Sequence, residues 1–164
     1  MLDDERTEPR NADTAVYRAV KDDLTRFATT LVGGDAAQDV VSTVVARALA
    51  GGGLSRLVDP RVYLLRAVRN ECRTVYRRRR REATLGATTM ERPAGGDPDS
   101  DDGLVRLVQS LPPQQRAATF LVYWVGCTPT EAAHIMRVRP ATLRRYLFLA
   151  RQRVKEGLDA IDNG

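Results

Sequence analysis

The sequence predicts an all-α fold in which two small helical domains are joined by a flexible acidic linker. Three observations support this prediction. Apolar residues recur at helical spacing along most of the chain, no segment alternates apolar and polar residues over a useful length, and residues 83–103 are rich in Gly, Pro and Asp without an apolar period. The linker divides the 164 residues into an N-terminal tail (1–12), a first domain (13–82) and a second domain (104–164).

Composition excludes several classes of protein. Hydrophobic residues make up 43% of the chain, which is enough for a folded core. The longest apolar run, 120–125, is too short to span a membrane, and the acidic N-terminus is unlike a signal peptide. Two isolated cysteines and one histidine exclude a disulfide framework and a Cys/His zinc site. We therefore expect a cytoplasmic protein that does not insert into a membrane and holds no metal.

Three helices are predicted in the first domain. Apolar residues spaced three or four apart predict a helix over 13–32, which Gly33-Gly34 ends. Asp35, with Gln38 three residues later, predicts a capping box at the start of a second helix that ends at the glycines 51–53. Asp59-Pro60 is an N-cap followed by proline at the first helical position, and this third helix runs into the arginines at 77–81.

Four helical segments are predicted in the second domain. Residues 104–111 form a short amphipathic segment, and Pro113 begins a helix that extends to Val125. Thr128-Pro129-Thr130-Glu131 is a capping box that begins a helix ending near Met136. Residues 137–139 form a turn, and Pro140 begins the last helix.

Four uncommon side chains are expected to be structural. We expect Cys72 and Cys127 to be buried as small apolar residues, and Trp124 to pack in the core of the second domain. The single histidine, His134, is expected at the surface.

The last two helices and their three-residue turn are typical of a helix-turn-helix. If Leu143 and Leu147 point inward, the opposite side of the last helix presents Arg145 and Phe148, flanked by Arg144. Arginine can contact guanine edges and phenylalanine a thymine methyl group. The alternative is a solvated amphipathic helix in an αα-hairpin.

Charge is distributed in blocks. Residues 61–82 carry nine basic and two acidic side chains, and residues 104–164 carry nine and four, whereas the linker is acidic. Two basic blocks indicate two surfaces that can contact a polyanion. Arginine supplies 24 of the 26 basic residues. Arginine is suited to phosphate and guanine contacts, but the codons of a GC-rich genome would also favour it.

Four segments follow one another along the chain: residues 35–50, residues 62–70 (VYLLRAVRN) with the arginine run after them, residues 111–116 (LPPQQR), and the helix-turn-helix at 128–155. In this order and spacing, the chain resembles the extracytoplasmic-function (ECF) class of bacterial sigma factors, in the sigma-70 family. Residues 35–50 occupy the place of region 2.2, residues 62–70 and the arginine run are similar to regions 2.3–2.4, and residues 111–116 and 128–155 are similar to region 4. The resemblance covers roughly residues 24–158.

The resemblance implies a factor that binds the clamp and flap regions of RNA polymerase core, reads promoter DNA as duplex and as melted single strand, and assists melting. An anti-sigma factor is a further candidate partner. Such a sigma factor is not an enzyme, because polymerase carries the catalysis, and it needs no cofactor. The residues implied for the −35 element are Arg139, Thr142, Arg144, Arg145 and Phe148. Those implied for the −10 element and its phosphates are Tyr63, Arg66, Arg69, Asn70, Arg73, Arg77, Arg78, Arg79, Arg80 and Arg81. Those implied for the polymerase contact are Asp39, Ser42, Thr43 and Arg47.

Some of these residues have other interpretations. Tyr63 can stack on an unpaired base or pack in the core, and Asn70 can bind a base edge or face solvent. The glycine-rich loop 51–58 can cradle a flipped base, as the resemblance implies, or be an ordinary connection. The aspartates of 97–102 can imitate RNA in a basic channel or only keep a tether solvated.

The sequence departs from the family pattern at three places. After Asp39, region 2.2 lacks its usual Gln and second acid, and Val45 replaces Phe, which bears on core binding. Arg137 stands at the turn position that usually holds Gly, where a left-handed backbone would cost about 1–2 kcal/mol. Leu149 replaces a DNA-contacting Arg. Two other functions therefore stay open: a helix-turn-helix regulator of duplex DNA, or an adaptor for polymerase or an anti-sigma protein that reads no promoter.

Overall fold

The structure is a computed structural model that describes residues 4–84 and 103–162. All of its regular elements are helices, and no strand occurs within these two ranges, so the predicted all-α class is confirmed. Most of the predicted linker, including the aspartates of 97–102, lies outside the described residues. Within the described ranges, no helix is both long enough and apolar enough to cross a bilayer.

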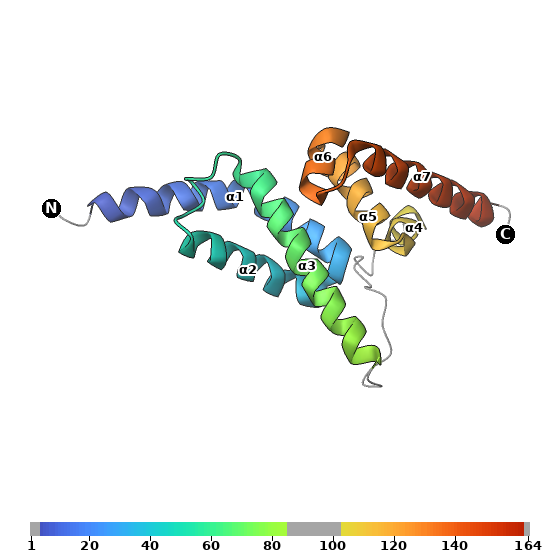
Figure 1. Ribbon diagram of the computed structural model, residues 1–164, viewed down its shortest axis with the longest axis horizontal. Helices are drawn as coiled ribbons and strands as arrows, with labels where there is room; N and C mark the ends of the chain where they lie inside the picture. Colours follow the sequence, from blue (N-terminus) through green and yellow to red (C-terminus); the bar gives the residue numbers. More distant parts are fainter. Residues whose placement is uncertain (1–3, 85–102, 163–164) are drawn as a thin grey trace.

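The first domain consists of α1 (Asp4–Val32), α2 (Gly34–Ala50) and α3 (Pro60–Thr84), which pack on one another (Figure 1). α1 begins nine residues before the predicted start. Residues 4–12 lack the apolar period that marks a core-facing helix, and they include Pro9, although their two Glu and two Arg favour helix intrinsically. The core contains Leu24 and Phe27 of α1, Val41 of α2 and Leu64 of α3.

The predicted capping box of α2 is wrong. The N-cap is Gly33, whose φ of 87° lies in the left-handed region, and no side chain caps the helix. Gly34 is already helical, so Asp35 lies within the first turn instead of ahead of it. There its charge still favours the positive end of the helix dipole. At α3 the prediction is confirmed, because the Asp59 Oδ1 accepts a hydrogen bond from the Val62 N–H at 3.0 Å.

The second domain consists of α4 (Gly103–Ser110), α5 (Pro113–Thr119), the π-helical segment η1 (Phe120–Trp124), α6 (Pro129–Met136) and α7 (Pro140–Asp162). η1 continues α5, so the helix predicted from Pro113 to Val125 exists but changes its winding. A π-turn holds about one more residue than an α-turn and therefore shifts the faces that follow it.

We expected Trp124 in the core, and the π-helical turn explains why this prediction is wrong. Trp124 is 62% exposed, whereas Phe120, Leu121 and Val125 are buried. The Trp124 ring stacks on Phe120 with centroids 6.0 Å apart, and the Arg26 guanidinium lies 5.6 Å from the ring centroid. The expectations for the other three residues are confirmed: Cys72 and Cys127 are buried and His134 is exposed.

The two domains pack directly against each other. α1 contacts α5 and η1, and α3 contacts α6, so helices far apart in the sequence lie side by side (Figure 1). The rings of Phe27 and Phe120 stack across this boundary with centroids 5.5 Å apart. The buried Arg116 of α5 donates to the backbone oxygen of Thr30 at 2.9 Å and to that of Leu111 at 2.9 Å. One continuous apolar core therefore runs through both domains.

Candidate nucleic-acid interface

The helix-turn-helix is built as its capping residues predict. The Glu131 N–H donates to Thr128 Oγ1 at 3.2 Å, and the Thr128 N–H donates to Glu131 Oε2 at 2.7 Å, which completes the capping box of α6. The Thr128 N–H and hydroxyl both donate to the Glu131 carboxylate, and these two hydrogen bonds lower the pKa of Glu131. Arg137 ends α6 with φ 51° and ψ 47°, so the left-handed backbone inferred at this position is present without glycine.

α7 separates an inner face from an outer face. Leu143, Leu147 and Ala150 are buried against the rest of the second domain. Arg144, Arg145 and Phe148 are exposed, with Phe148 57% exposed. Of the other residues implied for the −35 element, Arg139 is exposed and Thr142 is half-buried. An apolar ring exposed between arginines has no packing function inside the domain, which favours an external partner.

The N-terminal half of α3 presents a mixed surface. Tyr63 is 46% exposed, so it does not pack in the core, and Asn70 is half-buried. Arg73 is exposed, Arg66 is half-buried, and Arg69 is 4% exposed. The residues implied for the −10 element thus share one helix but differ widely in access to solvent.

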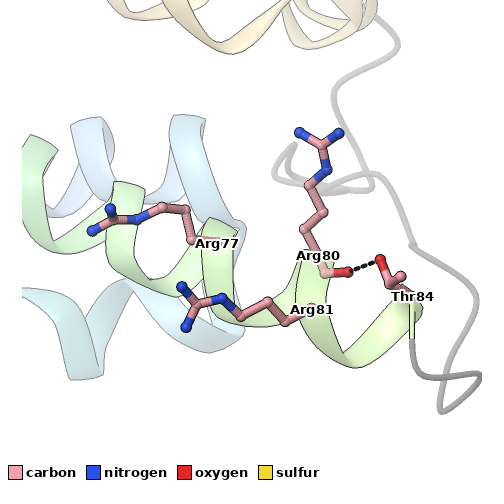
Figure 2. Close-up of a pocket in the computed structure, with 4 residues that line it drawn as sticks. All are labelled: Arg77, Arg80, Arg81 and Thr84. Atoms are coloured by element: carbon pink, nitrogen blue, oxygen red, sulfur yellow. Dashed lines mark hydrogen bonds between the residues drawn. The ribbon is translucent and has the colours of Figure 1, made fainter.

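The arginine run at the end of α3 divides into two groups. Arg79 donates to the backbone oxygen of Val32 at 2.7 Å, which satisfies the C-terminal end of α1, and Arg78 pairs with Glu82 at 2.9 Å. Arg77, Arg80 and Arg81 instead line a pocket of about 450 Å³ together with Thr84. Figure 2 shows Arg77 and Arg81 extending in one direction along the helix while Arg80 projects away from it. The guanidinium groups of Arg77, Arg80 and Arg81 form no ion pair with another described residue, unlike that of Arg78.

The residues implied for the polymerase contact lie along α2. Asp39, Ser42 and Arg47 are exposed and Thr43 is half-buried. Arg47 NH1 forms an ion pair with Glu71 Oε2 at 2.6 Å, which links α2 to α3. The Arg47 side chain is 70% exposed and that of Glu71 is 20% exposed, so the guanidinium stays open to a second partner while it holds the pair.

Sequence reasoning missed Asp13, which fixes the glycine-rich loop. Its Oδ1 accepts hydrogen bonds from the backbone N–H groups of Leu54 at 2.8 Å and Ser55 at 2.7 Å. These hydrogen bonds, above all that from Ser55, lower the pKa of Asp13. A Cβ at Gly53 would lie 2.8 Å from Asp13 Oδ2, so the carboxylate occupies the space that a side chain would fill. The loop is therefore held in place from α1, by a residue 41 positions away from Leu54.

The packing of the two domains covers part of α3. Arg69 NH2 donates to Gln114 Oε1 of α5 at 3.0 Å, and Arg66 NH2 lies 3.5 Å from the backbone oxygen of His134 in α6. Burial lowers the pKa of Arg69, and the nearby charge of Arg73 lowers it further. The helix-turn-helix face of α7 and the arginine run of α3 stay accessible, whereas Arg69 cannot contact DNA in this arrangement.

Two family models match the sequence along most of its length. The model for sigma-70 region 2 matches residues 16–82, and the model for sigma-70 region 4 matches residues 102–154. The chain belongs to the sigma-70 family. The two regions follow each other with only a short segment between them, which is the layout of the ECF class predicted from the sequence. A member of this family is a DNA-binding transcription initiation factor and not an enzyme.

Solved structures with the same fold have low sequence identity to this sigma factor. The sigma factor RpoE of Bartonella quintana, in complex with the anti-sigma factor NepR, is 23% identical with a TM-score of 0.64, and the match covers 96% of this chain and 98% of that one. CnrH, in complex with the cytosolic domain of CnrY, is 20% identical with a TM-score of 0.65, and the match covers 92% and 90%. No curated protein sequence is significantly similar to this chain.

Proposed function

We propose that this sigma factor binds RNA polymerase core, reads the −35 element with α7 and the −10 element with α3, and assists promoter melting. The observation that carries the proposal is the presence, in one chain, of a helix-turn-helix with an exposed arginine face and a second basic helix with an exposed aromatic residue. A regulator that reads only duplex DNA needs the first surface but has no use for the second.

The outer face of α7 supports duplex readout. Arg145 and Arg144 are exposed next to Phe148, so one helix offers both hydrogen-bond donors for guanine and an apolar contact for thymine. The left-handed Arg137 sets the angle between α6 and α7, as a turn in this motif must do. We infer that Arg139 and Thr142, at the start of α7, contribute positioning contacts to this readout.

α3 supports contact with melted DNA. The exposed ring of Tyr63 is available to stack on an unpaired base, and Arg77, Arg80 and Arg81 offer phosphate contacts. Arg66 and Arg69 are covered by the second domain, so their use requires the domains to separate. We infer that the two domains separate when polymerase binds through α2, because the −10 and −35 elements lie apart on the DNA and each is read by a different domain.

An anti-sigma partner fits the same scheme. RpoE of Bartonella quintana and CnrH are both described in complexes with such factors. In this chain, Tyr123 and Trp124 of η1 are 55% and 62% exposed beside the domain boundary. We propose these aromatic residues as contacts for a regulatory protein partner, since exposed rings of this size are common anchors in protein interfaces.

The direct experiment is run-off transcription with purified chain and core polymerase on pooled genomic fragments. We expect discrete start sites that require both proteins. A pair of variants tests the arginine run. Replacing Arg77, Arg80 and Arg81 by Ala should weaken the binding of holoenzyme to every promoter. It should also reduce the slope of log K against log salt concentration by about 0.9 for each lost phosphate contact. The control replaces Arg78, whose guanidinium pairs with Glu82. An equal salt slope in both variants would remove Arg77, Arg80 and Arg81 from the DNA contact.

A further inference from the structure

A cavity of about 350 Å³ lies between the two domains, where the middle of α3 faces the start of α5. Its lining residues are Leu31, Arg69, Cys72, Arg73, Tyr76, Arg77, Pro112, Pro113, Gln114 and Ala117. This volume is at the lower end of the range for small-molecule sites. One wall belongs to each domain, so the cavity exists only while the domains are packed together.

The polar groups of the cavity suit an anion. Three arginines, at 69, 73 and 77, recur every four residues and extend about 12 Å along one face of α3. Tyr76 and Gln114 add a hydroxyl and an amide group, and none of the described residues that line the cavity is acidic. Neither Arg73 nor Arg77 forms an ion pair or a hydrogen bond with another described side chain.

Arg69 shows that this positive charge is not balanced within the described protein. It is 4% exposed, and its NH1 is buried without a hydrogen-bond partner among the described residues. Its guanidinium bonds to the neutral Gln114, and its charged neighbours are Arg73 and Arg137. A buried charge normally has an ionic partner, because burial without one is costly.

We propose that this cavity is a binding site for a small phosphate-bearing anion, of diphosphate size or larger, that bridges α3 and α5. A row about 12 Å long exceeds the reach of a single phosphate, and arginines bind phosphate oxygens in a bidentate manner. The apolar walls, Leu31, Ala117 and the two prolines, can accommodate an organic group attached to the phosphates.

Such a ligand stabilises the packed arrangement of the domains. It binds only the state in which both walls are present, so it shifts the equilibrium toward that state by an amount that grows with the ratio of ligand concentration to Kd. In this state Arg69 cannot contact DNA, and the anion also occupies Arg73 and Arg77. The anion and promoter DNA therefore compete for the same helix, which would make the sigma factor responsive to a phosphorylated metabolite.

Calorimetric titration of the full chain with inorganic pyrophosphate at constant ionic strength tests the site. We expect saturable binding at one site. Arg73→Gln should weaken it about tenfold, because a hydrogen bond to a charged group is lost. Gln114→Ala, on the other wall, should also weaken it. Arg78→Gln removes the same charge from α3 but does not line the cavity, so it should leave the affinity within about twofold. Circular dichroism checks that each variant is folded.

Three results would overturn the proposal. Equal weakening by Arg73→Gln and Arg78→Gln would mean that pyrophosphate only condenses on a basic helix. An unchanged affinity in Gln114→Ala would place the ligand on α3 alone. Absence of saturable binding would mean that there is no site. None of these measurements uses polymerase or DNA, so they can fail or succeed independently of the proposed role in initiation. Repeating the titration with inorganic phosphate and with a nucleoside diphosphate, and comparing their affinities with that of pyrophosphate, identifies which part of the ligand is recognised.

Discussion

Replacing Arg69 by Met should strengthen the packing between the two domains. The guanidinium is 4% exposed, and it bonds to Gln114 Oε1 at 3.0 Å. Burial of a charge costs several kcal/mol, and a hydrogen bond to a charged group offsets about 1.5–3 kcal/mol of this. A net cost of about 1–3 kcal/mol therefore opposes the packing of the two domains. Methionine removes this cost and fills most of the same space, so the equilibrium should shift about 5–150-fold toward the packed state.

The assay is a distance distribution between spin labels on the two domains. Labels are attached to cysteines introduced by Arg18→Cys in α1 and Glu156→Cys in α7, which are exposed positions. The native Cys72 and Cys127 are buried, and burial raises the pKa of Cys72 to about 12, so it should react slowly with the label. Arg69→Met should narrow the distribution and enrich the short distance.

Arg73→Met is the matched control. Arg73 lies one turn further along α3 and is exposed, so its replacement should change the distribution much less. The reasoning is refuted if Arg69→Met enriches the long distance, because the hydrogen bond to Gln114 would then outweigh the cost of burying the charge.

Three further predictions concern the recognition helix, the turn and the loop. Arg145→Ala should cost about 1–3 kcal/mol at one −35 base pair and relax the preference there, as measured by binding to a set of single-base variants; a uniform loss would assign Arg145 to phosphate instead. Arg137→Gly should raise the free energy of unfolding by about 1 kcal/mol in urea denaturation, since φ is 51°; an unchanged midpoint would show that the turn is unstrained. Asp13→Ala should speed hydrogen exchange at the Leu54 and Ser55 amides near neutral pH. Because hydrogen bonds from the Ser55 and Leu54 amides lower the pKa of Asp13, the wild-type loop should keep this protection above the ordinary pKa of an aspartate and lose it as the pH falls through the lowered value. Protection that is independent of pH would contradict the carboxylate's role.

Local rules predicted those parts of the fold in which neighbours in sequence determine the geometry. The Thr128 capping box and the Asp59 cap each depend on residues within a few positions. The periodicity of Leu143 and Leu147 predicted the buried side of α7, and hence the exposed side that carries Arg145.

The failures have three physical causes. The Asp35 capping box failed although it is a local pattern, because Gly33 adopts a positive φ and α2 begins one residue earlier, which leaves Asp35 inside the first turn. Changes in helix winding are not evident in a periodic pattern, so the π-turn that exposes Trp124 could not be foreseen. Contacts between distant segments leave no local signal: Arg69 meets Gln114 across 45 positions, and Asp13 meets Leu54 across 41. An arginine that is buried by another domain has the same sequence context as one that faces DNA.

Permanganate footprinting of a promoter fragment is the most direct test of the central claim that one chain recruits polymerase and opens DNA. The fragment comes from the run-off experiment, and unpaired thymines near −10 are mapped with the chain alone, core alone and both together. We predict reactive thymines only with both proteins, reduced when Tyr63 is replaced by Ala. Duplex binding by the chain without core-dependent melting would contradict the account and indicate a helix-turn-helix regulator, and core binding without melting would indicate an adaptor.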